Sequence, residues 1–404
     1  MKHCLFLLAA LLGALAAGAA DVSPPAPVTV PGFTYVKTVG PISEYTLDAN
    51  GLQVLLLPDR SAPVLTFMVT YHVGSRNEVT GTTGATHILE HLMFKGSAKF
   101  NRALGTGYDQ TLDPLGAENN ASTWFDRTNY YVNAASEHLP LIAAMEADRM
   151  RHLLLREEDR RPEMTVVRNE FERGENSPYD ALIKEVFAVA YLAHPYHHDT
   201  IGWRSDIEKV PIEKLRAFYD TFYWPDNATV SVIGDFAPAA ALAQIQAQFG
   251  AIPRAPHPIP PVYTEEPAQT GGRRVTVKRA GELGVVAVGF KTPAATQADA
   301  PAVEVLAQIL ASGKNSRFFK ALTDRGLTTS VDPFNAFTHD PSLCLFFGSL
   351  APGATHAQVE QAMLAEVATL QQSGVTPGEV AAAVAKLQAS LAFARDGSFA
   401  IAGV

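Results

Sequence analysis

A proline-rich segment at residues 252–267 divides the sequence into two parts, and this feature most limits the folds open to the chain. Prolines at this density favour a semi-rigid linker over a helix or a strand. Patterns typical of strands and helices precede the segment, and the same order begins again after it. We therefore expect an α+β protein with two similar units, at 46–251 and 268–404, each an antiparallel-rich sheet with helices packed on one face.

Hydrophobic periodicity predicts the elements inside each unit. In the first unit it predicts strands at 51–57, 64–71 and 228–234, and helices at 83–94, 137–155 and 161–173. In the second unit it predicts strands at 273–279, 284–291 and 342–350, and a helix at 299–311. A last helix begins at Thr376-Pro377, and no closing strand follows it before Val404. We therefore expect the second unit to be incomplete at its C-terminus.

The N-terminus has the pattern of an export signal. Lys2 and His3 precede an apolar run that reaches Leu15, and small residues follow it at 17–20. This pattern is typical of a secretory signal peptide at 1–20, with an uncleaved membrane anchor as the alternative. We expect an extended leader at 21–45, a periplasmic or secreted location, and no stable membrane span after signal cleavage.

Charge and cysteine content exclude several classes of site. Among 404 residues, 32 Lys and Arg stand against 41 Asp and Glu, giving a net charge of −9, and no long basic run offsets it. This balance argues against nucleic acid as a partner. Without residues 1–20, Cys344 is the only cysteine, so neither an intramolecular disulfide nor a thiolate metal site is possible. Cys344 lies in an apolar run, and we expect a buried thiol.

The sharpest chemical signal is His87-x-x-Glu90-His91. On a helix these three side chains share one face, because positions i, i+3 and i+4 fall within an arc of about 100°. Two imidazoles one turn apart can bind zinc, and a neighbouring carboxylate can take a proton from the water that the metal activates. The alternative is an ordinary polar helix face on which two histidines flank a glutamate.

A catalytic zinc site of this kind needs a third protein ligand, and a carboxylate is the natural candidate. The helix expected at 161–173, with Pro162 in its first turn, carries Glu163 and Glu170 on one face. These two residues lie about 10.5 Å apart along the helix axis, so one zinc ion cannot readily bind both. Their spacing does not decide which of them is a ligand.

The sequence resembles the insulinase/pitrilysin family of zinc peptidases, which includes the mitochondrial processing peptidases. The resemblance rests on the histidine motif, on Glu163 and Glu170 in Glu-x-x-x-Val-Val-x-x-Glu, and on segments at 116–131, 194–202 and 223–235. It covers roughly 45–395. It implies one Zn²⁺ per catalytic unit, bound by His87, His91 and Glu170, with Glu90 as general base and Glu163 orienting the ligands.

The same resemblance implies a substrate-binding strand at Asn120-Ala121-x-Thr123. An edge strand beside the metal can capture an extended peptide through its free backbone groups. The alternative for 120–132 is an ordinary polar strand. The histidines at 194, 197 and 198 sit in a Pro-Tyr loop, and we expect them to be structural or solvated rather than ligands.

One departure from the family concerns the second unit. Active members carry an arginine and a tyrosine there, which hold the substrate and support the transition state. The matching positions in this chain are Thr323 and Thr329, so the pair is absent. In two-component members, one chain brings the zinc motif and its partner brings the pair. The resemblance therefore implies a second homologous unit or subunit that supplies the Arg/Tyr pair.

These observations lead to a zinc endopeptidase that hydrolyses peptides or unfolded polypeptide segments and needs a partner half. A non-catalytic, zinc-containing peptide-binding subunit of a peptidase or export complex is the alternative. The intact Glu90 favours the enzyme, and the missing Arg/Tyr pair favours the binding subunit.

Overall fold

The first unit is built on a seven-stranded sheet with strand order β1-β2-β3-β7-β4-β6-β5. The computed structural model describes residues 27–281, 284–395 and 397–402, and the expected signal peptide lies outside this range. Neighbouring strands are antiparallel except β3 and β7, which are parallel. The strands are β1 (Phe33–Val39), β2 (Ile42–Leu47), β3 (Gln53–Pro58), β4 (Val64–Tyr71), β5 (Glu118–Thr123), β6 (Thr128–Ala135) and β7 (Ala228–Gly234).

The hairpin of β1 and β2 corrects the expectation of an extended leader at 21–45. These strands pair from Phe33 opposite Leu47 to Val39 opposite Ile42, with Gly40 at positive φ in the turn. Ser43, Tyr45 and Leu47 alternate as buried residues of β2. The Pro- and Val-rich composition before residue 33 obscured this short alternating run, so the folded unit begins earlier than expected.

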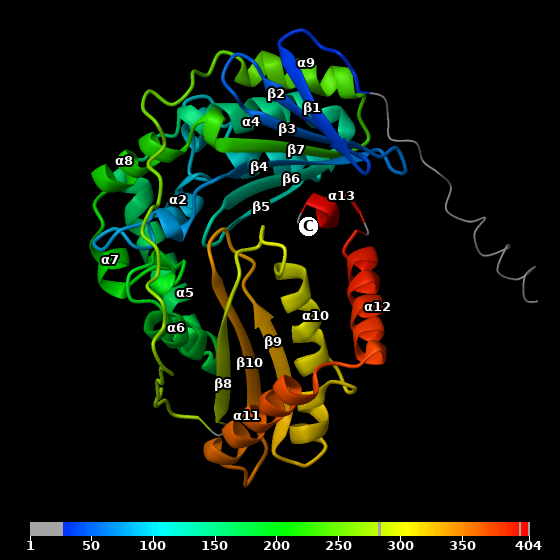
Figure 1. Cartoon of the computed structure of the whole chain (residues 1–404). Helices are drawn as coiled ribbons and strands as arrows, with labels where there is room; N and C mark the ends of the chain where they lie inside the picture. The colour runs from blue at the N-terminus through cyan, green and yellow to red at the C-terminus, as the bar shows by residue number, and fades with distance from the viewer. Residues whose placement is uncertain (1–26, 282–283, 396, 403–404) are drawn as a thin grey trace, which may run out of the picture.

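Helices cover one face of this sheet and extend beyond its β5 edge. Helices α4 and α9 pack on the sheet (Figure 1), where the rings of Phe67 and Phe249 stack. The remaining helices include the one that carries the histidine motif, α2. The bounds are α2 (Ala85–Leu92), α3 (Tyr108–Leu112), α4 (Leu139–Arg151), α5 (Glu157–Glu175), α6 (Pro178–Ala190), α7 (Arg204–Lys209), α8 (Ile212–Phe222) and α9 (Pro238–Phe249).

Helix α5 begins earlier than the sequence indicated. We expected Pro162 in the first turn, but the helix starts at Glu157 and Pro162 lies inside it. Three acidic residues at 157–159 occupy the first turn, where the positive end of the helix dipole favours them. They start the helix upstream of the proline, which removes only one amide donor from the second turn.

The segment between the units is held by side chains. Residues 253–281 contain no helix or strand, so the strand expected at 273–279 is wrong. Arg273 instead donates to the carbonyl oxygens of Val189 and Ala190 at the end of α6, at 3.0 and 2.7 Å. Arg279 contacts Glu175 at 2.8 Å. Arg273 and Arg279 thus anchor this segment to the first unit.

The second unit is built on a smaller, antiparallel sheet of order β8-β10-β9. Helices α10 and α11 pack on one face, and α6 of the first unit packs on the other (Figure 1). Cys344 is buried on β10, and burial raises the pKa of its thiol to about 12. The elements are β8 (Val285–Thr292), β9 (Thr328–Asn335), β10 (Ser342–Leu350), α10 (Ala300–Ala311), α11 (His356–Ser373), α12 (Pro377–Phe393) and α13 (Ser398–Ala402).

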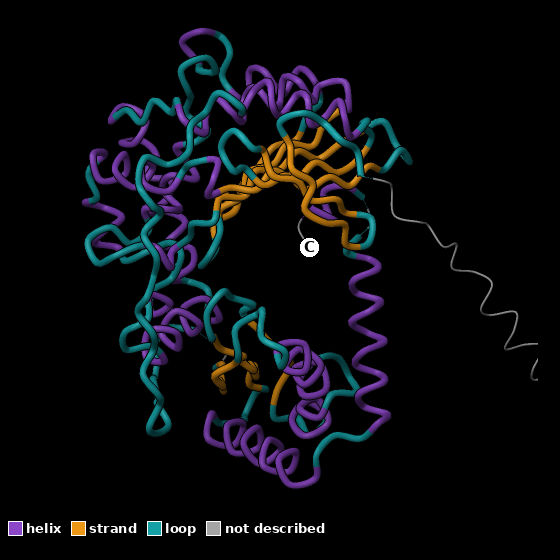
Figure 2. Tube along the Cα trace, turned by 45° about the horizontal axis from the view of Figure 1, so that its top comes forward, coloured by secondary structure: helices purple, strands orange, loops and turns teal. Residues whose placement is uncertain are grey.

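The chain returns to the first unit near its described end. Figure 2 shows α12 running along the side of the molecule from the second unit toward the first. Beyond α12, Ser398 contacts Thr66 on β4 at 2.9 Å, and the ring of Phe399 lies against Tyr131 on β6. Among the described residues, no helix combines the length and apolarity needed to cross a membrane.

Candidate metal centre

Helix α2 presents the histidine motif because its apolar side is buried. Ile88, Leu89 and Leu92 pack into the core of the first unit. Gly84 precedes the helix at φ +84°, and a Cβ at this position would overlap the carbonyl oxygen of Ile201. Only glycine therefore suits this turn.

Two carboxylates fix the start of α2. Glu78 accepts hydrogen bonds from the backbone amides of Gly84 and Thr86, at 2.7 and 2.8 Å. Asp206 of α7 accepts from the hydroxyl of Thr83 at 2.8 Å. Glu78 is fully buried, and burial raises its pKa to about 8. The contacts of Glu78 occupy amides that the first turn of any helix leaves without a partner.

His87, His91 and Glu170 come together between α2 and α5. Glu170 Oε2 lies 3.6 Å from His87 Nε2 and 3.5 Å from His91 Nε2. Among the described residues, these three are the group of histidine and carboxylate side chains whose ligand atoms can meet at a metal ion. Ligand atoms of a tetrahedral zinc ion lie about 3.3–3.6 Å apart, so the three side chains fit zinc.

Glu163 lies on the far side of His91 from this cluster. Its Oε1 contacts His91 Nδ1 at 3.0 Å, which leaves Nε2 of the same ring facing Glu170. Lys95 contacts the other oxygen of Glu163. Although burial opposes the charged form, hydrogen bonds from His91 and Lys95 outweigh it and lower the pKa of Glu163.

The two histidines differ in their tendency to hold a proton. Burial, reinforced by the nearby His91, lowers the pKa of His87 to about 3. For His91, burial is outweighed by the hydrogen bond to Glu163 and the charges of Glu170 and Glu90, which raise its pKa. His87 therefore favours the neutral form that binds a metal, whereas His91 retains its proton to higher pH, and a metal must displace that proton.

Glu90 faces the same site from the middle of the motif. Burial raises its pKa, and the hydroxyl of Thr123 donates a hydrogen bond to its Oε2. Thr123 belongs to the strand expected to bind substrate through its backbone, and its side chain contacts the candidate base. Sequence reasoning missed this contact because nothing in the spacing of β5 indicates which face its hydroxyl occupies.

Strand β5 forms the edge of the sheet beside the cluster. Ala121 and Asn120 pair with Tyr130 and Tyr131 of β6, and no further strand follows on the other side among the described residues. A cavity of about 400 Å³ lies between this strand and α5. It is lined by His87, Glu90, Ser122, Thr123 and Glu170, and continues past Lys184 to Asp199. The metal centre therefore opens on a space bounded by an edge strand.

The other histidines lie apart from this cluster. His194 contacts Asp340 of the second unit, Nε2 to Oδ2, at 3.0 Å. His198 Nδ1 donates to the carbonyl oxygen of Asp199 at 3.0 Å. The threonines of the second unit make local contacts: Thr323 and Thr328 share a hydroxyl hydrogen bond of 2.9 Å, and Thr329 is exposed.

Sequence reasoning also missed Glu78, Asp206 and Lys95. Glu78 and Asp206 lie in loops or at a helix start, where no periodicity marks them. Lys95 follows α2 by one turn, so its reach to Glu163 depends on how α2 and α5 pack. One signal was available for Glu78: an acidic residue shortly before a helix whose turn lacks its own capping side chain.

Two family models match the chain, one on each side of residues 203–208. Residues 53–202 match the family model described as insulinase (peptidase family M16), and residues 209–387 match the model described as peptidase M16 inactive domain. The chain is 31% identical over 358 residues to the zinc protease PqqE of Helicobacter pylori, covering 87% of this chain and 80% of that protein. It is 24% identical to the probable mitochondrial-processing peptidase subunit beta of Arabidopsis thaliana, covering 90% and 69%.

Solved structures show the same likeness. The crystal structure of a protease from Helicobacter pylori superposes with a TM-score of 0.83 at 30% identity, covering 93% of this chain and 88% of that one. A peptidase M16 inactive domain from Pseudomonas fluorescens gives a TM-score of 0.80, covering 90% and 85%. At 17% identity, the second likeness supports the fold alone.

Proposed function

This chain belongs to the insulinase (M16) family of peptidases, and from that premise we propose that it is a zinc-dependent endopeptidase acting on peptides or unfolded polypeptide segments. One observation carries the proposal. Two imidazole nitrogens and a carboxylate converge within 4.8 Å of one another, with Glu90 on the same helix, beside a cavity bounded by an edge strand. The combination supplies metal ligands, a base and a place for an extended chain.

In this proposal His87, His91 and Glu170 hold one Zn²⁺, and Glu163 orients His91 through its Nδ1. Zinc in such a site activates water and polarises a carbonyl group. The Glu90 carboxylate takes the proton of the attacking water and delivers it to the leaving amine. Its raised pKa suits both transfers, because a base that also returns its proton works best with a pKa nearer to the working pH.

Strand β5 holds the substrate in an extended form. Backbone groups at Asn120 and Ala121 would pair with the peptide, which gives affinity with little demand on its sequence. Thr123 also serves the reaction through its side chain, because its hydroxyl holds the Glu90 carboxylate.

The proposal includes a partner and a location. Thr323 and Thr329 stand where active relatives carry an arginine and a tyrosine, so a second homologous unit or subunit supplies that pair. The apolar N-terminal segment supports export of the chain to the periplasm or beyond the cell. The same two threonines favour a second candidate function, a zinc-containing peptide-binding subunit without turnover of its own.

Turnover separates the two functions. Zinc-loaded protein lacking residues 1–20 would be incubated with a pool of quenched peptides, beside Glu90→Gln and the control Glu137→Gln, whose side chain is 80% exposed. With a homologous partner added, we expect cleavage by the parent and the control, and none by Glu90→Gln with its zinc retained. Equal cleavage by Glu90→Gln would contradict the role of Glu90. No cleavage by the folded, zinc-loaded parent, even with a homologous partner added, would favour the binding subunit.

A further inference from the structure

The segment that leaves strand β5 is buried between the two units. Phe125 stacks on Phe187 of α6 and lies against Tyr196, with ring centroids 5.3 and 5.1 Å away. Trp124 lies against Phe334 of β9 in the second unit. These rings belong to an apolar cluster that residues of both units share. The end of the edge strand is therefore fixed by the second unit as well as by its own sheet.

A turn of the first unit binds the same segment through its backbone. In the turn Ser75–Asn77, the amides of Ser75 and Arg76 donate to the carbonyl oxygens of Trp124 and Phe125, at 3.2 and 2.8 Å. A Cβ on Gly74 would overlap both carbonyl groups, so the two backbones are in direct contact. Any shift of this turn must therefore move the end of β5.

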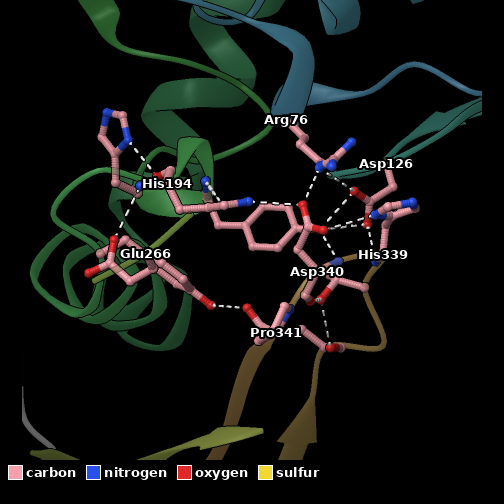
Figure 3. A network of polar contacts seen from close by, with 12 residues as sticks. Arg76, Asp126, His194, Glu266, His339, Asp340 and Pro341 are labelled. Carbon is pink, nitrogen blue, oxygen red and sulfur yellow. Dashed lines mark hydrogen bonds and ion pairs between the residues drawn. The ribbon is translucent and has the colours of Figure 1, made fainter. Parts of the chain in front are cut away.

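A polar network ties this turn to the second unit (Figure 3). Asp340 lies in the connection between β9 and β10, and its Oδ2 contacts Arg76 Nε at 2.5 Å and His194 Nε2 at 3.0 Å. Asp126, three residues beyond β5, accepts hydrogen bonds from the Tyr196 hydroxyl at 2.8 Å and from the amide of His339 at 2.9 Å. We call these residues the Asp340 network.

The network closes on itself through Tyr196. The amide of Asp340 donates to the Tyr196 hydroxyl at 3.1 Å, and the hydroxyl donates to Asp126. Although partial burial opposes the charged form, hydrogen bonds from Arg76, His339 and His194 outweigh it and lower the pKa of Asp340. The charged Asp340 carboxylate therefore accepts a hydrogen bond from a mostly buried Arg76 side chain. A charge-assisted hydrogen bond of this kind is strong and fixes the geometry of both groups.

The same turn is connected to helix α2, which carries the histidine motif. Glu78 follows Arg76 by two residues, and its carboxylate binds the first amides of α2. The turn Ser75–Asn77 thus contacts Asp340 on one side, the end of β5 on another, and leads directly into the cap of α2. Both elements that line the metal cavity depend on where this turn sits.

We propose that Asp340, contributed by the second unit, is a positioning residue that fixes the edge strand β5 against helix α2 by holding Arg76 and the loop at Asp126. The statement that β5 binds a peptide rests on the proposed function. The apolar cluster can hold the units together without this charge, so the specific effect of Asp340 lies in the placement of the strand. It acts through its neighbours and touches neither metal nor substrate.

The test compares Asp340→Asn with Asp332→Asn, which removes the same charge from an exposed position on β9 of the same unit. Both are made in zinc-loaded Glu90→Gln protein, which cannot consume the probe. The probe is fluorescein-labelled, reduced and carboxymethylated lactalbumin, followed by anisotropy. We expect Asp340→Asn to weaken binding about tenfold and to speed amide exchange at 124–127, with zinc content unchanged. Asp332→Asn should match the parent, and Asp340→Glu should recover part of the affinity.

Each outcome decides a separate point. If Asp340→Asn binds the probe like the parent, or lowers thermal stability without faster exchange at 124–127, the positioning role is wrong. If the parent does not bind the probe, the proposed substrate class fails, while the exchange data still decide on Asp340. Should Asp340→Asn not fold, Arg76→Lys keeps the charge but lacks the Nε donor. We expect the same changes from it, and unchanged exchange in it would equally contradict the proposal.

Discussion

At the scale of the residue, the structure separates two glutamates that the sequence could not tell apart by spacing. Glu163 and Glu170 lie on the same face of α5, two turns apart. Glu170 lies near Nε2 of both histidines, whereas Glu163 contacts Nδ1 of His91. One ring thus stands between the two carboxylates, and we assign a different task to each of them.

Glu163→Gln should weaken zinc binding without abolishing it. Gln can still contact His91 but lacks the charge that favours the correct tautomer, and changes at such partners cost roughly 10–100-fold in metal affinity. Titration with a competing chelator measures the loss, with Glu137→Gln as the control for an exposed carboxylate. Unchanged affinity would show that His91 needs no orienting partner.

At a pH near 6.5, the ordinary pKa of histidine, zinc binding should release about one proton per ion. His91, whose pKa is raised, is protonated there, whereas His87, with a pKa of about 3, is already neutral. Zinc affinity should therefore fall as the pH drops through the pKa of His91. Calorimetric titration in buffers of different ionisation enthalpy counts the protons, and release of two would contradict the assigned protonation states.

At the scale of the element, helix α2 depends on the turn before it. Gly84 stands at positive φ against the Ile201 carbonyl. Glu78 accepts from the amides of Gly84 and Thr86, and Asp206 accepts from the amide of Thr83. The turn is therefore as important for the metal centre as the helix itself. Its contacts come from three separate parts of the first unit.

Gly84→Ala should destabilise the protein more than Gly81→Ala. Both glycines have positive φ, where alanine costs about 1–2 kcal/mol, but only Gly84 faces a carbonyl oxygen, while Gly81 has open space around it. We expect a further loss of about 1–3 kcal/mol from the clash, together with weaker zinc binding. Denaturant unfolding of the two variants gives the comparison. Equal losses would mean that the close approach at Gly84 is unimportant.

The elements also show how far the sequence could predict the fold. The strands expected at 64–71, 228–234 and 342–350 agree with β4, β7 and β10, because buried central strands are continuous apolar runs. The strand expected at 273–279 is wrong, since Arg273 and Arg279 there bind the first unit through their side chains and the segment joins no sheet. Strands β1 and β2 were missed because their pattern is short and follows a proline-rich stretch.

For the site, the sequence could predict which side chains share a helix face but not how two helices meet. The one-turn spacing in α2 follows from helix geometry, so His87, Glu90 and His91 were readable. The contact of Thr123 with Glu90 and of Glu78 with α2 depends on tertiary packing across long sequence distances. Such contacts have no periodic signal in a single sequence.

At the scale of the whole molecule, the second unit packs on α6 and closes one side of the first. The three-stranded sheet lies between its own helices and α6, and Glu266 and Arg273 tie the connecting segment to the end of α6. The Asp340 network adds a polar link beside this apolar contact. A unit without metal ligands among its described residues thus contributes to the surroundings of the edge strand.

Installing the missing pair tests the need for a partner. Thr323→Arg with Thr329→Tyr should raise the turnover of the chain alone, because the family resemblance implies that the pair belongs at these positions and Thr329 is exposed. Thr323→Lys with Thr329→Phe keeps size and charge but changes the hydrogen-bonding groups, and serves as the control. Hydrolysis of the quenched-peptide pool measures the effect. Equal turnover in both double variants would argue against this account of the partner.

The central claim is that α2 and α5 together make a zinc centre, and X-ray diffraction at the zinc absorption edge tests it most directly. Crystals of the zinc-loaded protein should show one strong anomalous peak, bonded to His87 Nε2, His91 Nε2 and a Glu170 oxygen at about 2.0–2.2 Å. Glu163 should remain on Nδ1 of His91. A peak at other side chains, or no peak in protein saturated with zinc, would contradict the account.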